Sequence, residues 1–150
     1  MKKFNNIAAF AAAVGADLGV SDWVVIDQAR INQFADATGD RQWIHVDQER
    51  AEGGPFGRTI AHGFLTLSMI PVFHQQIYAV ENVSMAVNYG LDKVRFISPV
   101  PEGARIRGSA VLDSAEVLDG AVQGVVRTTI EVEGNEKPAA IVTSIVRYFG

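Results

Sequence analysis

The chain has 150 residues, which is enough for one hydrophobic core and short for two. Hydrophobic residues make up 48% and charged residues 20%, which excludes a disordered chain and predicts a single compact domain over residues 1–150. The net charge is −4 and the basic residues are scattered, so nucleic acid is not an expected partner. The absence of cysteine excludes disulfides, a thiol nucleophile and thiolate metal sites.

The first residues have some features of an export signal, because Lys2-Lys3 precedes the small-residue run Ile7–Ala16. Asn5 and Asn6 interrupt the apolar residues at the start of the chain, and apolar residues recur at helical spacing from Phe4 to Ala11, so we expect a helix here. No apolar stretch approaches the length of a membrane span. We therefore expect a cytoplasmic protein without a membrane partner.

The next elements are a short strand over Trp23–Ile26 and a helix that Asp27 caps. The helix is predicted by apolar residues at positions 31, 34, 35 and 38, which follow the i, i+3, i+4, i+7 pattern. Gly39 is the residue expected where a helix ends in a left-handed cap. The helix should therefore end near Thr38 and deliver Asp40 into a turn.

Asp40 and His45 form an unusual pair in a chain with only three histidines. Five residues rotate a side chain by about 140° on a helix, and an odd offset on a strand places the two on opposite faces. The two side chains can converge on one small molecule only if the chain turns between them. We therefore expect His45 to swing back beside Asp40.

A brief helical turn from Asp47 to Ala51 and the loop Gly53–Gly57 should follow, and we expect this loop to lie over the site. The segment from Phe64 to Phe73 is apolar on nearly every side, which predicts a buried helix with a kink at Pro71. Its start has free backbone N–H groups near Gly63, where a developing negative oxygen could be held.

Everything after Val83 has the alternation of an antiparallel sheet. The apolar phase slips near Gly90–Asp92, as a β-bulge would cause, and Asp119-Gly120 and Gly134-Asn135 predict turns. Residues Ala139–Tyr148 are apolar on both faces, which predicts a central strand. A buried helix followed by a curved antiparallel sheet is the α+β hotdog layout, whose uncovered edge predicts a homodimer.

Several motifs together resemble the MaoC-like family of (R)-specific enoyl-CoA hydratases. They are Ala37-Thr38-Gly39-Asp40, His45 five residues later, the run from Gly57 to Gly63, Asn88-Tyr89-Gly90, Val94-Arg95-Phe96 and Pro99-Val100. The chain has Gln42-Trp43 where the hydratase motif commonly has Asn-Pro, and this variant resembles the nodulation-protein-N-like branch.

The resemblance implies water addition to a trans-2-enoyl-CoA thioester, or the reverse dehydration, with Asp40 as base and His45 as its partner and proton shuttle. This scheme requires no metal and no cofactor, since coenzyme A is part of the substrate. Gly63 would bind the thioester oxygen, and His62 and Arg58 complete the expected substrate-binding set.

Each assignment also has a structural interpretation. Asp40 could be only a cap for the following turn, and His45 could be a ring buried in the core. His62 could be a hydrogen bonder at the start of a helix, and His74 could be a surface residue at the end of one. Trp43 could be either a lid over the acyl pocket or part of the core. A metal set of Asp40, His45, Asp47 and His62 is a further alternative. Candidates for coenzyme A phosphates beyond Arg58 are Lys93, Arg95, Arg105 and Arg107, most of which we expect on the solvated side of a strand.

Two other functions remain open. A hotdog thioesterase usually places its carboxylate on the buried helix, but residues 62–76 contain no Asp or Glu. A non-catalytic acyl-binding dimer would use Asp40 and His45 only as polar anchors.

Overall fold

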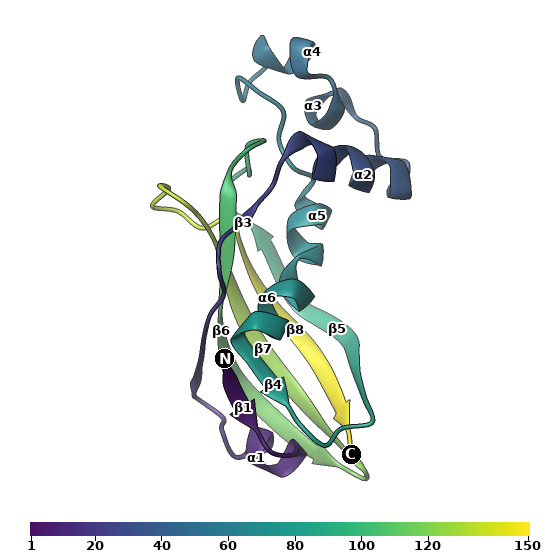
Figure 1. The fold of residues 1–150 in the computed structure, drawn as a ribbon, viewed down its shortest axis with the longest axis vertical. Helices are drawn as coiled ribbons and strands as arrows, with labels where there is room; N and C mark the ends of the chain where they lie inside the picture. The colour runs from purple at the N-terminus through teal and green to yellow at the C-terminus, as the bar shows by residue number, and fades with distance from the viewer.

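The computed structural model describes residues 1–150 and has helices lying along one curved antiparallel sheet (Figure 1). The sheet order is β2-β6-β7-β8-β5, with the short strand β3 also paired to β6. The strands are β2 (Asp17–Val20), β3 (Val24–Val25), β5 (Met85–Phe96), β6 (Arg105–Leu118), β7 (Ala121–Val132) and β8 (Ala140–Phe149). This arrangement confirms the predicted α+β hotdog fold.

The first helix is shorter than its apolar spacing predicts. Helix α1 spans Ile7–Ala11, and Asn6 caps it through an Oδ1 that accepts from the Ala9 N–H at 2.8 Å. The residues before it form β1 (Lys2–Phe4), which pairs in parallel with β4 (Tyr78–Val80). Including Phe4 in the helix was therefore wrong, because its backbone pairs with a strand far along the chain.

Helix α2 (Gln28–Thr38) confirms both predicted ends. The Asp27 carboxylate accepts from the Arg30 N–H at 2.9 Å, and Gly39 has a φ of +81° and donates its N–H to the carbonyl of Ala35. Two short helices follow, α3 (Trp43–Val46) and α4 (Gln48–Glu52). Together α2, α3 and α4 form a group at one end of the sheet (Figure 1).

The central apolar helix is broken into α5 (Gly63–Ser68) and α6 (Ile70–Ile77). The break precedes Pro71, which lies in the first turn of α6, where its missing N–H costs no hydrogen bond. Phe73 is fully buried against the sheet, but Phe64 is 69% exposed and Val72 is 38% exposed. The expectation that this segment is buried on every side was therefore wrong.

The last three strands follow the predicted turns, and β8 lies between β7 and β5 as expected for a central strand. The register of β5 with β8 shifts between Leu91 and Lys93, where the sequence predicts a bulge, and also between Asn88 and Gly90. These shifts bend β5, which is the last strand of the sheet and exposed along most of its length.

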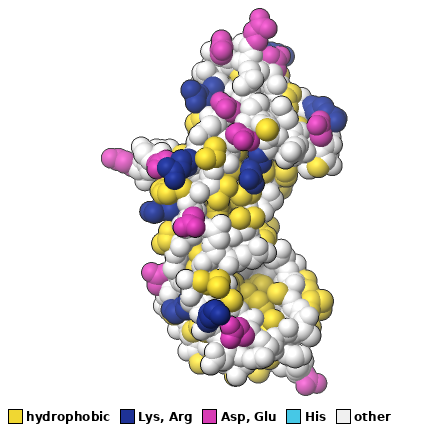
Figure 2. All heavy atoms as spheres, in the orientation of Figure 1, with side chains coloured by type: hydrophobic (Ala, Val, Ile, Leu, Met, Phe, Trp, Pro, Cys, Tyr) yellow, Lys and Arg dark blue, Asp and Glu magenta, His cyan; other side chains and the backbone are white.

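One hydrophobic core of 25 buried residues joins the sheet to α5 and α6. On the face shown in Figure 2, the lower half of the molecule is hollowed beside β5, and hydrophobic side chains line the hollow. None of the helices has the length and apolarity needed to cross a membrane. The cytoplasmic location stays a prediction.

Candidate active site

The turn after α2 places Asp40 outside the helix, with its carboxylate exposed. The left-handed conformation of Gly39 ends the helix one residue earlier and redirects the chain. The carboxylate has only one hydrogen-bond donor from the protein, a long contact of 3.4 Å from the Gln42 N–H. Asp40 is therefore not a strong helix cap, and its oxygens remain available to a ligand.

His45 lies on α3 and is 7% exposed. Its Nδ1 lies 2.7 Å from the carbonyl oxygen of Ile60, and because a carbonyl can only accept, Nδ1 carries the proton. Burial is the main cause that lowers the pKa of His45, and nearby His62 lowers it further, while the Ile60 carbonyl and Asp40 partly oppose the shift. A neutral ring with a free Nε2 lone pair can accept a proton.

His62 immediately precedes α5 and is 2% exposed. Its ring stacks on that of His45, with centroids 3.8 Å apart and planes 24° apart, and its Nε2 donates to the backbone carbonyl of Asp40 at 2.9 Å. It is therefore a hydrogen bonder at the start of the helix, as the structural interpretation predicts, but its bond goes to the turn of Asp40 and does not cap α5. Its Nδ1 is buried and has no partner in the protein.

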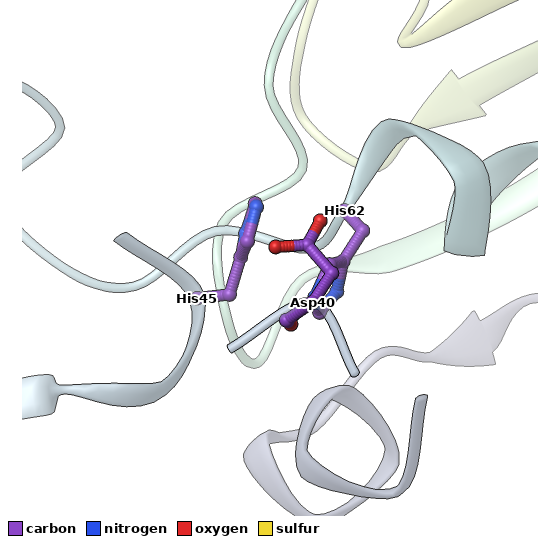
Figure 3. Close-up of side chains that lie close together, drawn as sticks. All are labelled: Asp40, His45 and His62. Atoms are coloured by element: carbon purple, nitrogen blue, oxygen red, sulfur yellow. The ribbon is translucent and has the colours of Figure 1, made fainter. Parts of the chain in front are cut away.

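Asp40, His45 and His62 converge as Figure 3 shows, with the carboxylate of Asp40 beside the two rings. One carboxylate oxygen and one nitrogen from each ring lie within 4.8 Å of one another. Two hydrogen bonds of about 2.8 Å at a tetrahedral water oxygen span roughly 4.6 Å. The cluster can therefore hold a single water molecule between Asp40 and His45.

The same cluster fits a metal ion poorly. An ion bound by two imidazoles must lie near both ring planes, at about 2.0–2.1 Å from each nitrogen. The rings of His45 and His62 are stacked almost face to face, so no point at that distance lies in both planes. Asp47, the fourth member of the predicted metal set, instead caps α4 by accepting from the Arg50 N–H at 3.0 Å.

A cavity of about 350 Å³ opens beside His45 and has mainly apolar walls. Gly63 and Thr66 of α5 line one side, and Phe96 of β5 and Phe56 of the Gly53–Gly57 loop also line it. The ring of Phe96 would lie 3.2 Å from a Cβ at Gly63, so a larger residue would require this ring to shift and glycine allows the close contact as it stands. The prediction that the loop lies at the site is confirmed by Phe56.

Sequence comparison identifies the family to which this site belongs. A model of the MaoC like domain matches residues 9–135. The chain belongs to the MaoC-like domain family. It is 56% identical to 3-hydroxyacyl-thioester dehydratase Z of Mycobacterium tuberculosis over 149 residues, which cover 99% of both chains. It is 44% identical to nodulation protein N of Rhizobium meliloti over 137 residues, covering 89% of this chain and 85% of that protein.

Structural comparison gives the same fold. The (R)-hydratase from A. caviae involved in PHA biosynthesis superposes with a TM-score of 0.71 and 20% sequence identity, covering 89% of this chain and 94% of that one. The predicted likeness to MaoC-like proteins, including the nodulation-protein-N-like branch, is confirmed.

The arginines considered as contacts for the coenzyme A phosphates lie either at the border of the site or on the outer face of the sheet. Arg58 lines a neighbouring cavity that shares Ser98 and Pro99 with the site cavity, and it donates to the carbonyl of Glu102 at 3.1 Å. Arg107 forms an ion pair with Glu131 of β7, and Arg105 forms one with Glu133 just after β7. The expectation of a solvated strand face is confirmed for these two, whereas Arg58 remains a candidate at the border of the site.

Two aromatic predictions have different outcomes. Trp43 packs beneath the guanidinium of Arg50 and against Gly54, and it does not line the site cavity, which supports a structural role. His74 was predicted as a surface residue at a helix end; it does lie in the last turn of α6, but it is partly buried. Its Nε2 lies 2.8 Å from the hydroxyl oxygen of Thr128, and burial lowers its pKa to about 4.

Sequence reasoning missed Thr66 and Phe96 as residues of the site, and it placed the Gly53–Gly57 loop there without singling out Phe56. The available signal for Thr66 was a hydroxyl at the third position after Gly63 in an otherwise apolar helix. Nothing in the local sequence indicates that Phe96, on a distant strand, contacts the start of α5.

Proposed function

We propose that the protein is a 3-hydroxyacyl-thioester dehydratase that works reversibly, adding water to a trans-2-enoyl-CoA to give the (R)-3-hydroxyacyl-CoA. The observation that carries this proposal is the convergence of the Asp40 carboxylate and the His45 ring within bridging distance of one water, next to an apolar cavity that His45 lines. The 56% identity to a protein named as such a dehydratase supports it over the whole chain.

In the hydration direction, the water oxygen bonds to C3 while its proton moves to Asp40. The electron pair of the C2–C3 double bond moves toward the thioester oxygen, and the proton then returns to C2 on the same face. His45 holds the water through Nε2 and shuttles the proton, because its Nδ1 is fixed on Ile60. General acid–base groups of this kind contribute about 10²- to 10⁴-fold each.

The start of α5 supplies the third part of the scheme. The N–H of Gly63 has no partner within its own helix, and the residue lines the cavity beside His45. We assign this N–H to the thioester oxygen, where negative charge develops. Every group in the scheme comes from the chain and the substrate, with coenzyme A as part of the substrate and Arg58 near its path.

The direct test uses crotonyl-CoA and follows loss of the enoyl absorbance. Asp40→Asn should lower kcat by at least about 10²-fold and leave the fold intact, because the carboxylate is exposed and weakly bonded. His45→Asn should act similarly, since its amide can keep the donor to Ile60 while losing Nε2. Full activity in either variant would contradict the dyad.

The same assay distinguishes the alternative functions. Release of free thiol would indicate a thioesterase, although α5 and α6 carry no carboxylate. Binding of acyl-CoA without turnover would indicate a non-catalytic acyl-binding protein. Dehydration of (R)-3-hydroxybutyryl-CoA but not the (S) isomer would support the proposed stereochemistry.

We also propose that the protein is a homodimer paired along β5. This twelve-residue strand ends the sheet, so one row of its backbone groups has no strand partner. Large apolar side chains are exposed along it and beside it, namely Phe64, Met85, Val87, Tyr89, Leu91 and Phe96. A second copy would cover these side chains and remove the open edge.

A further inference from the structure

The buried polar side chains of this protein almost all have hydrogen-bond partners. Among the buried hydroxyls, Ser21 accepts from the Gly108 N–H, Thr59 donates to Gln28, and Thr128 contacts the ring of His74. Thr66 is 3% exposed, and no hydrogen bond of its hydroxyl to another group of the chain is present, yet its oxygen is not sealed off from the cavity that the residue lines. The hydroxyl is therefore available to a ligand in this cavity.

The orientation of Thr66 differs from that of other helical hydroxyls. Ser68, on the same helix, donates to the carbonyl of Leu65 at 2.7 Å, and Thr38 donates to that of Phe34 at 2.7 Å. This bond to a preceding carbonyl is the usual arrangement for a hydroxyl within a helix. Thr66 does not make it, and the residue lines the cavity beside His45.

The position of Thr66 on α5 places it one turn after Gly63. Residues three apart share a helix face, and helical side chains lean toward the N-terminus of their helix. The side chain of Thr66 therefore extends toward the turn that begins at Gly63, and both residues line the same cavity. Its hydroxyl and the Gly63 N–H can reach the same ligand atom.

We propose that Thr66 is a substrate-contacting residue whose hydroxyl donates to the thioester oxygen together with the Gly63 N–H. This inference rests on the proposed dehydratase function. As water adds to C3, the C2–C3 electron pair moves toward this oxygen, and the hydroxyl hydrogen stabilises the charge without leaving Thr66. The charge disperses again when C2 receives its proton. Such donors act more strongly on the transition state than on the bound substrate.

Three substitutions at Thr66 separate the hydroxyl from the side-chain shape. Thr66→Val replaces the hydroxyl by a methyl group of similar size, and we expect kcat on crotonyl-CoA to fall by about 10²-fold. Thr66→Ser keeps the hydroxyl and should stay within about fivefold of the wild type. Thr66→Ala also lacks the hydroxyl and adds no bulk, so it provides the comparison if the valine variant does not fold by circular dichroism.

Binding of the saturated thioester butyryl-CoA provides a second measurement. We expect its Kd to change by less than about threefold in Thr66→Val, because the hydroxyl acts on charge that only the reaction creates. Wild-type kcat in both hydroxyl-free variants would overturn the assignment, as would a serine variant as slow as valine. An inactive wild-type protein would instead overturn the proposed function, so the two failures are distinguishable.

Discussion

His62 contacts both Asp40 and His45, while its Nδ1 has no hydrogen-bond partner in the protein. Its ring stacks on His45, and its Nε2 holds the backbone carbonyl of Asp40. Asp40 itself has few other bonds, namely the 3.4 Å contacts that its N–H and its carboxylate make with Thr38 and Gln42. His62 thus fixes the position of Asp40 relative to His45.

Two substitutions of His62 test this positioning role. In His62→Gln the amide nitrogen can reach the place of Nε2 and keep the bond to Asp40, whereas the shorter His62→Asn cannot. We expect kcat to fall about 10²-fold in the asparagine variant, since small displacements of a reacting group have effects of this size. The glutamine variant should recover most of that loss.

Steady-state kinetics on crotonyl-CoA measure both variants, with thermal unfolding as the control for folding. KM should change little in either variant, because His62 holds the carbonyl of Asp40 and not the substrate. An equal loss of kcat in the two variants would mean that the bond to the carbonyl is not what matters.

At the scale of single residues, the sequence revealed the chemistry but not the contacts. Asp40, His45 and Gly39 could be predicted because a left-handed glycine, an acid and an imidazole lie within seven residues. The stacking of His62 on His45 depends on how α3 and α5 pack, and no local pattern encodes that packing.

Helix α6 places the titratable ring of His74, which is partly buried, against the sheet. The ring contacts the hydroxyl of Thr128 on β7, and its Nδ1 lies 3.5 Å from the hydroxyl of Tyr78, which in turn accepts from Tyr148. None of these neighbours is a carboxylate that would stabilise a charged ring. The free energy of protonating His74 is therefore unfavourable in the folded state.

This environment predicts a dependence of stability on pH. The pKa of His74 falls from 6.5 to about 4 on folding, so between these values the unfolded chain binds a proton that the folded chain does not. The free energy of unfolding therefore keeps its full value with respect to His74 above pH 6.5. It decreases as the pH falls from 6.5 toward 4, and the total loss is about 3 kcal/mol.

The variant His74→Gln isolates this effect, because glutamine does not titrate and can still bond to Thr128. Urea unfolding between pH 4 and 7 should show a steeper loss of stability in the wild type than in the variant. Parallel curves for the two proteins would contradict a neutral buried ring, since the other histidines are common to both.

At the scale of elements, the helix ends that depend on local residues were predicted correctly, whereas short strands that depend on a distant partner were not. The ends of α2 follow from Asp27 and Gly39, which act within one turn of the chain. The strands β1, β2 and β4 were missed because each has three or four residues and depends on a distant partner. The same reason explains the error at His74, whose burial depends on β7.

At the scale of the whole molecule, the long open edge of the sheet is β5. The opposite edge is formed only by the short strands β2 and β3, which share the edge of β6. Phe64 of α5 lies against Phe96 of β5, with ring centroids 6.3 Å apart, so the exposed apolar surface continues from the strand onto the helix. A partner on this side would lie next to the site cavity, which Phe96 also lines.

Phe64→Glu tests whether a second copy covers this side. The side chain is 69% exposed in the single chain, so the substitution should leave the fold stable while placing a charge in the proposed interface. Light scattering after size exclusion should give the mass of two chains for the wild type and a shift toward one chain for the variant. Val117→Glu is the matched control, because Val117 is 73% exposed on β6, which β7 and β8 separate from β5 in the sheet, and it should keep the wild-type mass. A wild-type protein with the mass of one chain would contradict the homodimer. Equal two-chain masses for the wild type and Phe64→Glu would contradict an interface at this side of the molecule.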